Sequence, residues 1–406
     1  MKISTDEKII NRILSKGVEG ILPSKEKLRK LLKSGKCLNV YQGFDPTGPT
    51  LHIGHTVGMR KLEDFRKLGH QVYFVIGDFT ARIGDPSDKT STRVKLTKQQ
   101  VEENMKLYVN QASHYIDISN KDNPVKVVYN SKWLKPLDFE DLVELSSIFT
   151  VQQMIKRSMF QERLKSDKPI YLHEFLYPLM QGYDSVALNI DIEIGGNDQL
   201  FNMLAGRDMV MNKLKKEKFV IAMKLLEAND GTKMGKTSGN MIELNDNANN
   251  IFGKVMSFDD KLIPVGFEIL TNYEKEQAEE ISKRLKEGEN PMILKKLLAF
   301  EITKDIKGEK EALNAQKYFE SIFQEKNLNT KIPIKEIKQE RINILDLIVQ
   351  CKIAESKSQA KRLIQQKAVS INKEKIIDWK KEISINNNDI VLKCGKYVYQ
   401  IKHITN

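Results

Sequence analysis

Residues 38–56 constrain the fold of this chain more than any other stretch. They read Leu-Asn-Val-Tyr-Gln-Gly-Phe-Asp-Pro-Thr-Gly-Pro-Thr-Leu-His-Ile-Gly-His-Thr. The hydrophobic pattern predicts a buried strand over 38–44, a turn over 45–50 and a helix over 56–68. A continuous apolar run follows at 71–77 and is typical of a strand buried on both faces. Strand, crossover helix and strand in this order predict a right-handed βαβ unit of a parallel sheet.

Two histidines and a glycine stand at the start of the predicted helix. His52 and His55 are expected on its first turn, where unpaired backbone N–H groups and a partial positive charge favour an anion such as phosphate. Gly54 removes the side chain that would keep a flat base away from the backbone. Taken alone, the pattern also fits a helix start with two surface histidines. A metal site is a weaker alternative, because no third His or Cys lies nearby.

Composition places the chain among ordinary proteins of two or three domains. Of its 406 residues, 40% are apolar and 30% are charged. It has no run of about 18 apolar residues, and its first residues predict a polar amphipathic helix, so we expect neither a membrane span nor an export signal. Three widely spaced cysteines, Cys37, Cys351 and Cys394, argue against disulfides and structural zinc and favour a reducing cytoplasm.

Charge is concentrated toward the C-terminus. The chain carries a net charge of +12, and residues 336–406 contain 14 Lys and Arg against 8 Asp and Glu, which gives that part +6. A basic total is weak evidence by itself, but its placement makes the C-terminal part the natural candidate for contact with nucleic acid.

Further strands and helices are predicted along the chain. The later strands are expected at 124–129, at 188–194 before Gly195-Gly196, and at 219–223, with a helix starting near Asp198. Residues 131–170 read as a helical insertion, and its apolar set could be a dimer contact or simply core. That set comprises Leu142, Val143, Leu145, Ile148, Phe149, Val151 and Met154.

The organisation changes after the last of these strands. We expect a Rossmann-like α/β catalytic domain over 1–240, helices over 241–328, a lysine-rich linker over 329–341 and a compact α+β domain over 342–402. In the helical part, Asn290-Pro291 fits an N-cap and a first helical residue.

A glycine-bearing loop supplies two lysines. It runs Asp-Gly-Thr-Lys-Met-Gly-Lys-Thr-Ser-Gly-Asn over 230–240 and holds Lys233 and Lys236. Glycines allow such a loop to move, and two ammonium groups can then close on a triphosphate. A solvated loop with two lysines is the plain alternative.

A polar stripe lies on an otherwise apolar helix. Tyr177, Gln181 and Asp184 are at i, i+4 and i+7 and therefore share one face. Solvent faces in this chain are rich in Lys and Glu, whereas this face carries groups that orient a small polar ligand. An outward solvent face is the alternative.

Taken together, these motifs resemble those of class I aminoacyl-tRNA synthetases. Residues 52–55 resemble the HIGH signature, which also looks like the HxGH of small nucleotidyltransferases, and residues 233–237 resemble the KMSKS loop, with changes at its third and fifth positions. With Tyr41 and the Gly-Gly-Asn-Asp-Gln stretch at 195–199, the polar stripe closely resembles the amino-acid pocket of tyrosyl-tRNA synthetases. The resemblance covers residues 35–240 and continues into the C-terminal part.

The resemblance implies a role for each matching residue. Tyr41 and Asp184 would bind the phenolic hydroxyl of tyrosine, while Tyr177, Gln181 and Asp85 would hold its ammonium group, and Gln199 would lie near its carboxylate. Residues expected at ATP or its phosphates are His52, Gly54, His55, Lys89, Arg93, Asp198, Lys233 and Lys236.

The implied activity is attachment of tyrosine to its tRNA in two steps. The substrate carboxylate is ionised at neutral pH and attacks the α-phosphorus of ATP, and a ribose hydroxyl of the tRNA then attacks the tyrosyl-adenylate. Mg²⁺ is expected with ATP, no protein-bound metal is expected, and the resemblance implies a cytoplasmic homodimer.

The C-terminal part resembles the α-L RNA-binding fold. Lys357, Lys361 and Arg362 lie on a predicted helix that could follow a phosphate backbone. Two rival functions remain open. A small nucleotidyltransferase would lack the phenol-binding set and the basic C-terminal part, and a non-catalytic RNA-binding relative would be expected to have lost the histidines or the loop lysines.

Overall fold

The computed structural model describes residues 3–85, 96–227, 241–323, 333–366, 368–372, 374–385, 390–395 and 397–403. The chain divides into two units, Met1–Asn247 with Val255–Gly308, and Ala248–Lys254 with Glu309–Asn406. The expected boundary at 240/241 differs from this division, because α13 (Ile263–Leu270) packs on α3 (Ile53–Lys67) of the first unit. No helix within these described ranges is long and apolar enough to span a bilayer.

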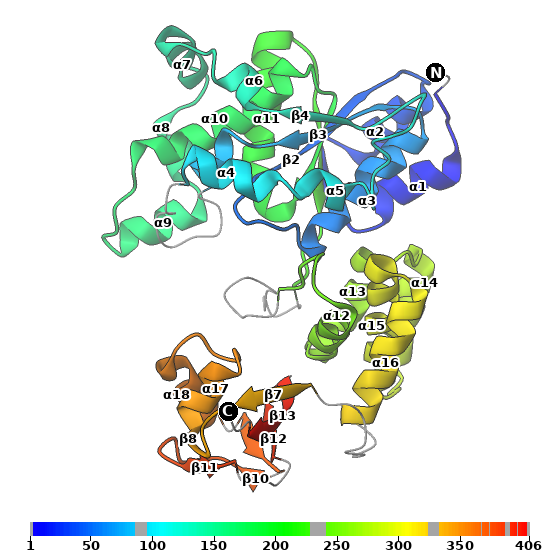
Figure 1. Ribbon diagram of the computed structural model, residues 1–406. Coiled ribbons are helices and arrows are strands. Elements are labelled where there is room, and N and C mark those ends of the chain that lie inside the picture. The colour runs from blue at the N-terminus through cyan, green and yellow to red at the C-terminus, as the bar shows by residue number, and fades with distance from the viewer. Residues whose placement is uncertain are drawn as a thin grey trace. The chain divides into compact units, whose positions relative to one another are not determined.

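A six-stranded sheet forms the centre of the first unit (Figure 1). Its strand order is β1-β6-β5-β2-β3-β4, in which β1 is antiparallel and the other strands are parallel. The strands are β1 Val18–Leu22, β2 Asn39–Phe44, β3 Gln71–Ile76, β4 Lys126–Tyr129, β5 Ile192–Gly196 and β6 Phe219–Met223. All five residues of β6 are buried, as a continuous apolar run requires of a strand covered on both faces.

Helices connect and cover these strands. The helices of the first unit before β6 are α1 Glu7–Ser15, α2 Lys25–Lys33, α3, η1 Thr80–Arg82, α4 Lys98–Met105, α5 Tyr108–Ala112, α6 Ser131–Leu134, α7 Phe139–Ser146, α8 Val151–Ile155, α9 Ser158–Lys165, α10 Leu172–Ala187, η2 Asn197–Gln199 and α11 Leu200–Leu214. α3 leads from β2 to β3, and α11 leads from β5 to β6, in opposite directions along the sheet. Right-handed crossovers therefore put α3 and α11 on opposite faces.

The predicted parallel sheet is confirmed, with two differences at element ends. α3 begins at Ile53 with His52 as its N-cap, three residues before the predicted start, so the histidines do flank its first turn. The predicted strand 188–194 is shorter, because Leu188 is the C-cap of α10 and the strand begins only at Ile192. Ile190 is nevertheless fully buried, so its alternation with polar residues reports burial and not strand geometry.

The expected helical region follows β6. The structure gives α12 Ala248–Met256, η4 Asp260–Leu262, α13, α14 Lys275–Lys286, α15 Pro291–Lys307 and α16 Glu309–Phe323. Asn290 is the N-cap of α15, where its Oδ1 accepts a hydrogen bond from Met292 N at 3.0 Å, as the Asn-Pro pair predicted.

The second unit has a small mixed fold of its own. Its five-stranded sheet has the order β10-β9-β12-β13-β7, and a two-stranded sheet pairs β11 with β8. The elements are β7 Ile334–Ile337, β8 Arg341–Asn343, α17 Ile344–Gln350, α18 Lys357–Gln365, β9 Val369–Ile371, β10 Glu374–Lys375, β11 Glu382–Ser384, β12 Ile390–Cys394 and β13 Tyr397–His403. Eighteen buried residues between Ile337 and Ile401 form its core.

The predicted linker at 329–341 is not wholly a linker. Its residues 334–337 form β7, which pairs in parallel with β13. Lysine and glutamate separate the two isoleucines of this short strand, so its apolar pattern is weak, although Ile337 is buried against the core. Pro333 precedes the strand, where proline is tolerated.

Candidate active site

The strand order of the large sheet reverses between β2 and β5. The chain moves from β2 to β3 and β4 on one side, and from β5 to β6 on the other. In open parallel sheets, ligands bind at the carboxyl ends of the strands at such a reversal. The turn after β2 carries Asp45, and β5 leads directly into Gly196 and η2, so both ends contribute polar groups to one place.

The polar stripe of α10 faces this place. Tyr177 is buried, and its hydroxyl donates to Asp45 Oδ2 at 2.8 Å. Burial raises the pKa of Tyr177 well above its usual value, and the neighbouring carboxylates of Asp45, Asp85 and Asp184 raise it further. One hydroxyl therefore lies within electrostatic range of three carboxylates that come from different segments.

Asp184 is held by two donors from the region after β4. Trp133 Nε1 donates to its Oδ1 at 2.7 Å, and Asn130 Nδ2 donates to its Oδ2 at 3.4 Å. Burial nevertheless raises the pKa of Asp184 well above that of an ordinary carboxyl, because the loss of hydration outweighs both donors.

A chain of hydrogen bonds joins Asp184 to Asp45. The Asn130 amide that contacts Asp184 also donates to Thr80 Oγ1 at 3.0 Å, and Thr80 Oγ1 donates to Asp45 Oδ1 at 2.6 Å. Together with Tyr177, this network fixes the positions of the two carboxylates relative to each other.

Tyr41 lies on β2 and is fully buried. Its hydroxyl donates to Glu193 Oε1 on β5 at 2.7 Å, with Gln181 O at 3.1 Å, and accepts a hydrogen bond from Ser185 Oγ at 3.2 Å. The pKa of Tyr41 is raised well above its usual value by burial first, then by Glu193 and Asp184. Tyr41 and Asp184, predicted as a pair, are thus electrostatic neighbours.

Asp85 and Gln199 are in direct contact. Gln199 Nε2 donates to Asp85 Oδ2 at 2.6 Å, and Asn202 Nδ2 donates to Gln199 Oε1 at 2.9 Å. Arg157 NH2 lies 4.0 Å from Asp85 Oδ1 and its side chain is buried. The two residues expected around the amino and carboxyl groups of the substrate therefore form one cluster.

His52 and His55 stack against each other at the start of α3. Their ring centroids are 3.7 Å apart, and His52 N donates to His55 Nδ1 at 3.0 Å. Because Nδ1 accepts this bond, the proton of the neutral His55 ring sits on Nε2. A Cβ added to Gly54 would lie 3.0 Å from His52 Cε1, so the glycine also gives the imidazole its room.

Four predicted phosphate ligands lie outside the described residues. These are Lys89, Arg93, Lys233 and Lys236. Asp198, expected at the ribose, is in η2 and half-buried, directly after β5. Among the described residues, no group of three His, Cys, Asp or Glu side chains is arranged to hold a metal ion.

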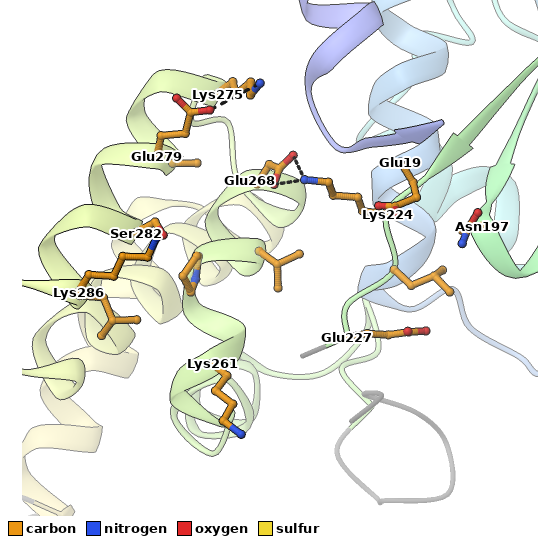
Figure 2. Close-up of a pocket in the computed structure, with 15 residues that line it drawn as sticks. Glu19, Asn197, Lys224, Glu227, Lys261, Glu268, Lys275, Glu279, Ser282 and Lys286 are labelled. Carbon is orange, nitrogen blue, oxygen red and sulfur yellow. Dashed lines mark hydrogen bonds and ion pairs between the residues drawn. The ribbon is translucent and has the colours of Figure 1, made fainter. Parts of the chain in front are cut away.

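A separate cavity of about 730 Å³ adjoins η2 at Asn197 (Figure 2). One wall comes from the segment after β6, with Lys224, and the opposite wall comes from α13 and α14. Lys224 crosses between the walls and binds both carboxylate oxygens of Glu268 at 2.8 Å. The cavity lies beside the strand ends but is not lined by Tyr41, Tyr177 or Asp184.

The three predicted RNA contacts lie on α18. Lys357 is exposed and pairs with Asp346 at 2.6 Å, and the Lys361 ammonium lies 4.1 Å from the centroid of the Trp379 ring. Arg362 is exposed on the same helix. The Lys380 ammonium also lies 5.2 Å from the centroid of this ring, and an aromatic ring beside cations is a feature that RNA-binding surfaces use.

Several residues of the cluster were missed by the sequence interpretation. They are Asp45, Thr80, Asn130, Trp133, Ser185, Glu193, Asn202 and Lys218. Glu193 had a usable signal, because it is a charged residue between two isoleucines of a strand predicted to be buried. The others are common turn or helix residues whose importance depends on partners distant in sequence.

Comparisons with known proteins find two families that match this chain. A family described as class I tRNA synthetases (W and Y) matches residues 33–324, and a family described as the tyrosine–tRNA ligase SYY-like C-terminal domain matches residues 324–401.

Individual relatives cover nearly the whole chain. The tyrosine–tRNA ligase of Aquifex aeolicus is 41% identical over 386 residues, which cover 95% of this chain and 96% of the relative. That of Thermotoga maritima is 42% identical over 387 residues, with 95% of each chain covered.

Solved structures show the same fold. A C-terminally truncated mitochondrial tyrosyl-tRNA synthetase from Aspergillus nidulans has a TM-score of 0.64 at 18% identity and covers 78% of this chain and 95% of its own. A tyrosyl-tRNA synthetase from Archaeoglobus fulgidus, solved with L-tyrosine, has a TM-score of 0.60 at 18% identity, with 77% and 100% covered.

Proposed function

This chain belongs to the class I tyrosyl-tRNA synthetases, and on that premise we propose how its residues perform tyrosine activation and transfer. As a tyrosine–tRNA ligase, it joins tyrosine to tRNA at the expense of ATP. The cluster at the β2–β5 reversal is our candidate for the tyrosine site. The observation that carries this proposal is the network joining Asp45, Thr80, Asn130 and Asp184, because it holds two carboxylates at fixed positions relative to each other.

We assign the two ends of tyrosine to different parts of this network. Tyr41 and Asp184 would meet the phenolic hydroxyl, and Tyr177, Gln181 and Asp85 would surround the ammonium group. A carboxylate accepts hydrogen bonds strongly from a cationic donor, so Asp85 suits an ammonium group. A phenylalanine side chain would leave the buried polar groups near Tyr41 without a partner, which is unfavourable.

Adenylate formation needs positioning more than proton transfer. The tyrosine carboxylate is already ionised at neutral pH and forms a bond to the α-phosphorus of ATP, while the bond from that phosphorus to pyrophosphate breaks. The Nε2–H of His55 is a suitable donor to a phosphate oxygen at the start of α3, where the helix dipole adds favourable potential. Lys233 and Lys236 are proposed to act on the same phosphates from the loop at 230–240.

Asp198 is proposed to bind the ribose of ATP. Its position directly after β5, beside the cavity that begins at Asn197, supports this role. Gly54 is proposed to let the adenosine approach the start of α3, and Lys89 and Arg93 to assist at the phosphates.

Mg²⁺ is proposed to enter with ATP and not as a resident ion. The carboxylates of the site already accept protein donors: Asp45 from Tyr177 and Thr80, and Asp184 from Trp133 and Asn130. Mg²⁺ bound to nucleotides is held largely by phosphate oxygens and water, and it would neutralise charge on the phosphates there.

The second step requires tRNA, and the second unit is proposed to help bind it. A ribose hydroxyl at the 3′ end attacks the carbonyl carbon of the adenylate, and AMP leaves. Lys357, Lys361 and Arg362 on α18 are the proposed phosphate contacts, since backbone contacts position RNA without reading its sequence.

A homodimer and a cytoplasmic location complete the proposal. Phe139, Val143 and Val151 in the helical segment after β4 are 80%, 57% and 69% exposed, which supports a second copy of the chain as their partner. The cysteines described are free thiols, as in a reducing compartment.

Pyrophosphate exchange tests the site assignment. Purified protein with Mg²⁺ and ATP should exchange pyrophosphate with tyrosine and not with phenylalanine or tryptophan. Asp184→Asn should raise the tyrosine KM about tenfold or more, because a hydrogen bond to a charged group is lost. An unchanged tyrosine KM in Asp184→Asn would contradict the proposed role of Asp184 in binding tyrosine. Absence of exchange with any amino acid would favour a non-catalytic RNA-binding protein.

A further inference from the structure

A buried ion pair lies behind the proposed tyrosine site. Glu193 on β5 is 1% exposed, and its Oε2 pairs with Nζ of Lys218, which is 0% exposed. Neither residue belongs to the substrate contacts proposed above. Burying two charges is unfavourable unless their hydrogen bonds are satisfied, so this pair requires an explanation.

Every donor of the Lys218 ammonium has an acceptor. It donates to Glu193 Oε2, to Ser185 Oγ at 2.8 Å and to Met203 O at 3.4 Å. Burial lowers the pKa of Lys218, and the neighbouring Glu193 carboxylate opposes this shift. A Cβ on Gly206 of α11 would clash with Lys218 Nζ, so glycine at that position makes room for the ammonium group.

These groups close a ring of hydrogen bonds with a fixed direction. Lys218 donates to Ser185 Oγ, Ser185 Oγ donates to the Tyr41 hydroxyl at 3.2 Å, and Tyr41 donates to Glu193 Oε1 at 2.7 Å. An ammonium group can only donate and a carboxylate can only accept. The two hydroxyls between them must therefore both donate toward Glu193.

Glu193 also orients an amide. Its Oε1 accepts a hydrogen bond from Gln181 Nε2 at 2.9 Å. Because a carboxylate has no proton to give, the amide must turn its NH₂ group to Glu193 and direct its Oε1 elsewhere.

We infer that Glu193, held by Lys218, is a positioning residue for tyrosine recognition that makes Tyr41 and Gln181 hydrogen-bond acceptors toward the substrate. The inference rests on the proposed roles of Tyr41 and Gln181. Ser185 occupies one acceptor position of the Tyr41 oxygen and leaves a second one for the phenolic O–H of tyrosine. The Gln181 oxygen suits the ammonium group. Both substrate groups are donors, and phenylalanine lacks the first.

The test replaces the ion pair without leaving a buried charge. In Glu193→Gln/Lys218→Met, residue 193 becomes an amide that can donate as well as accept, so the direction of both bonds is no longer fixed. In pyrophosphate exchange we expect the tyrosine KM to rise about tenfold or more, kcat to change less than about threefold, and the preference for tyrosine over phenylalanine to fall about tenfold or more. The ATP KM should stay within about twofold.

A second variant and a matched control separate positioning from folding. Glu193→Gln alone should also raise the tyrosine KM and lower the preference for tyrosine over phenylalanine. This single variant is measured if circular dichroism shows that the double variant is unfolded. Arg163→Met/Glu174→Gln removes a different buried ion pair of this unit, whose side chains are 2% and 5% exposed. It should lower the melting temperature and leave the tyrosine-to-phenylalanine ratio unchanged.

Three outcomes would overturn the inference, and they differ in whether they also contradict the proposed roles of Tyr41 and Gln181. A folded Glu193 variant with an unchanged tyrosine KM and ratio overturns the inference alone. Unchanged tyrosine KM in both Tyr41→Phe and Gln181→Ala overturns it together with the proposed site roles. A control variant that lowers the ratio as much as the Glu193 variant would show a general effect of lost stability.

Discussion

Two carboxylates of the candidate site, Asp45 and Asp184, are each held by two hydrogen-bond donors from the protein. Asp45 accepts from the Tyr177 and Thr80 hydroxyls, and Asp184 accepts from the Trp133 indole and the Asn130 amide. Substrate groups must therefore add to these bonds or replace them. Removing one donor at a time should weaken tyrosine binding by about the free energy that the lost hydrogen bond contributed.

Tyr177→Phe tests this at one hydroxyl. The change removes the 2.8 Å bond to Asp45 and keeps the ring. We expect the tyrosine KM in pyrophosphate exchange to rise about tenfold, since a hydrogen bond to a charged group contributes about 1.5–3 kcal/mol. The exposed Tyr171 offers the control Tyr171→Phe, which should leave the tyrosine KM unchanged. Equal effects of both variants would contradict a role for the Tyr177 hydroxyl.

His70 should make stability depend on pH. It is fully buried, accepts a bond from Leu38 N at 3.4 Å, and burial lowers its pKa from 6.5 to about 4. Between these values the unfolded chain binds a proton that the folded chain excludes, so stability falls as pH drops from about 6.5 toward 4. The loss between pH 7 and pH 5 should be about 2 kcal/mol.

Urea unfolding at pH 7 and pH 5 measures this contribution. The difference in unfolding free energy between the two pH values should be about 2 kcal/mol smaller in His70→Gln than in the unchanged chain. Equal differences in the two proteins would mean that other groups cause the pH dependence.

At the level of elements, α10 carries three of the residues proposed to contact tyrosine. Tyr177, Gln181 and Asp184 lie on one face of it, and the helix packs closely on α11, where a Cβ added to Gly182 would lie 3.3 Å from Gly206 Cα. Its first turn is tied to α9 by the buried pair of Glu174 with Arg163. The close packing on α11 therefore holds the polar stripe in place, and the ion pair adds to the stability of the helix start.

Arg163→Ala should destabilise the first unit strongly. It leaves the Glu174 carboxylate buried without its cation, and breaking such a pair costs about 3–5 kcal/mol. Thermal and urea unfolding measure the loss. Lys106→Ala breaks an exposed pair with Glu103, whose side chains are 62% and 61% exposed, and should change stability by less than about 0.5 kcal/mol. Similar losses in both variants would contradict the proposed importance of burial.

At the scale of the whole molecule, the second unit has a core of its own. This core is a cluster of buried residues between 337 and 401 that includes both Cys351 and Cys394. A change on its surface should therefore affect tRNA without affecting the adenylate site. Replacing Lys357, Lys361 and Arg362 by Ala should leave tyrosine-dependent exchange unchanged.

The same triple variant should weaken tRNA binding. The slope of log Kd against log salt concentration should fall by about 0.7 to 0.9 for each phosphate contact removed. Filter binding of the tRNA over a salt series measures the slope. An unchanged slope would exclude these three cations from the phosphate contacts.

Assembly is a second property of the whole molecule. If Phe139 and Val143 contact a second copy of the chain, Phe139→Glu/Val143→Glu should convert a dimer into a monomer in sedimentation equilibrium. Ile377 is 74% exposed in the other unit, and Ile377→Glu should leave the mass unchanged. If the protein without substitutions sediments as a monomer, the proposed dimer is refuted.

The sequence by itself determined the parallel sheet, the presence of a helix beside the two histidines and the polar stripe of α10. These features depend on hydrophobic periodicity and on turn residues, and both can be read from residues that are close together in the sequence. The sequence does not distinguish core from contact surface in the apolar set at 142–154, and the structure divides it: Leu145 and Met154 are in the core, whereas Val143 and Val151 are exposed. Its helical spacing could not say which face is covered.

Only the tertiary structure decided which polar groups meet. Asp45 and Tyr177 are 132 positions apart, and Tyr41 and Glu193 are 152 apart, yet each pair shares a hydrogen bond. The strand register that brings Tyr41 beside Glu193, and the buried lysine that fixes the direction of their bond, leave no periodic pattern in the sequence. Burial and hydrogen-bond direction are properties of the assembled sheet and helices, because they depend on which distant groups exclude water together.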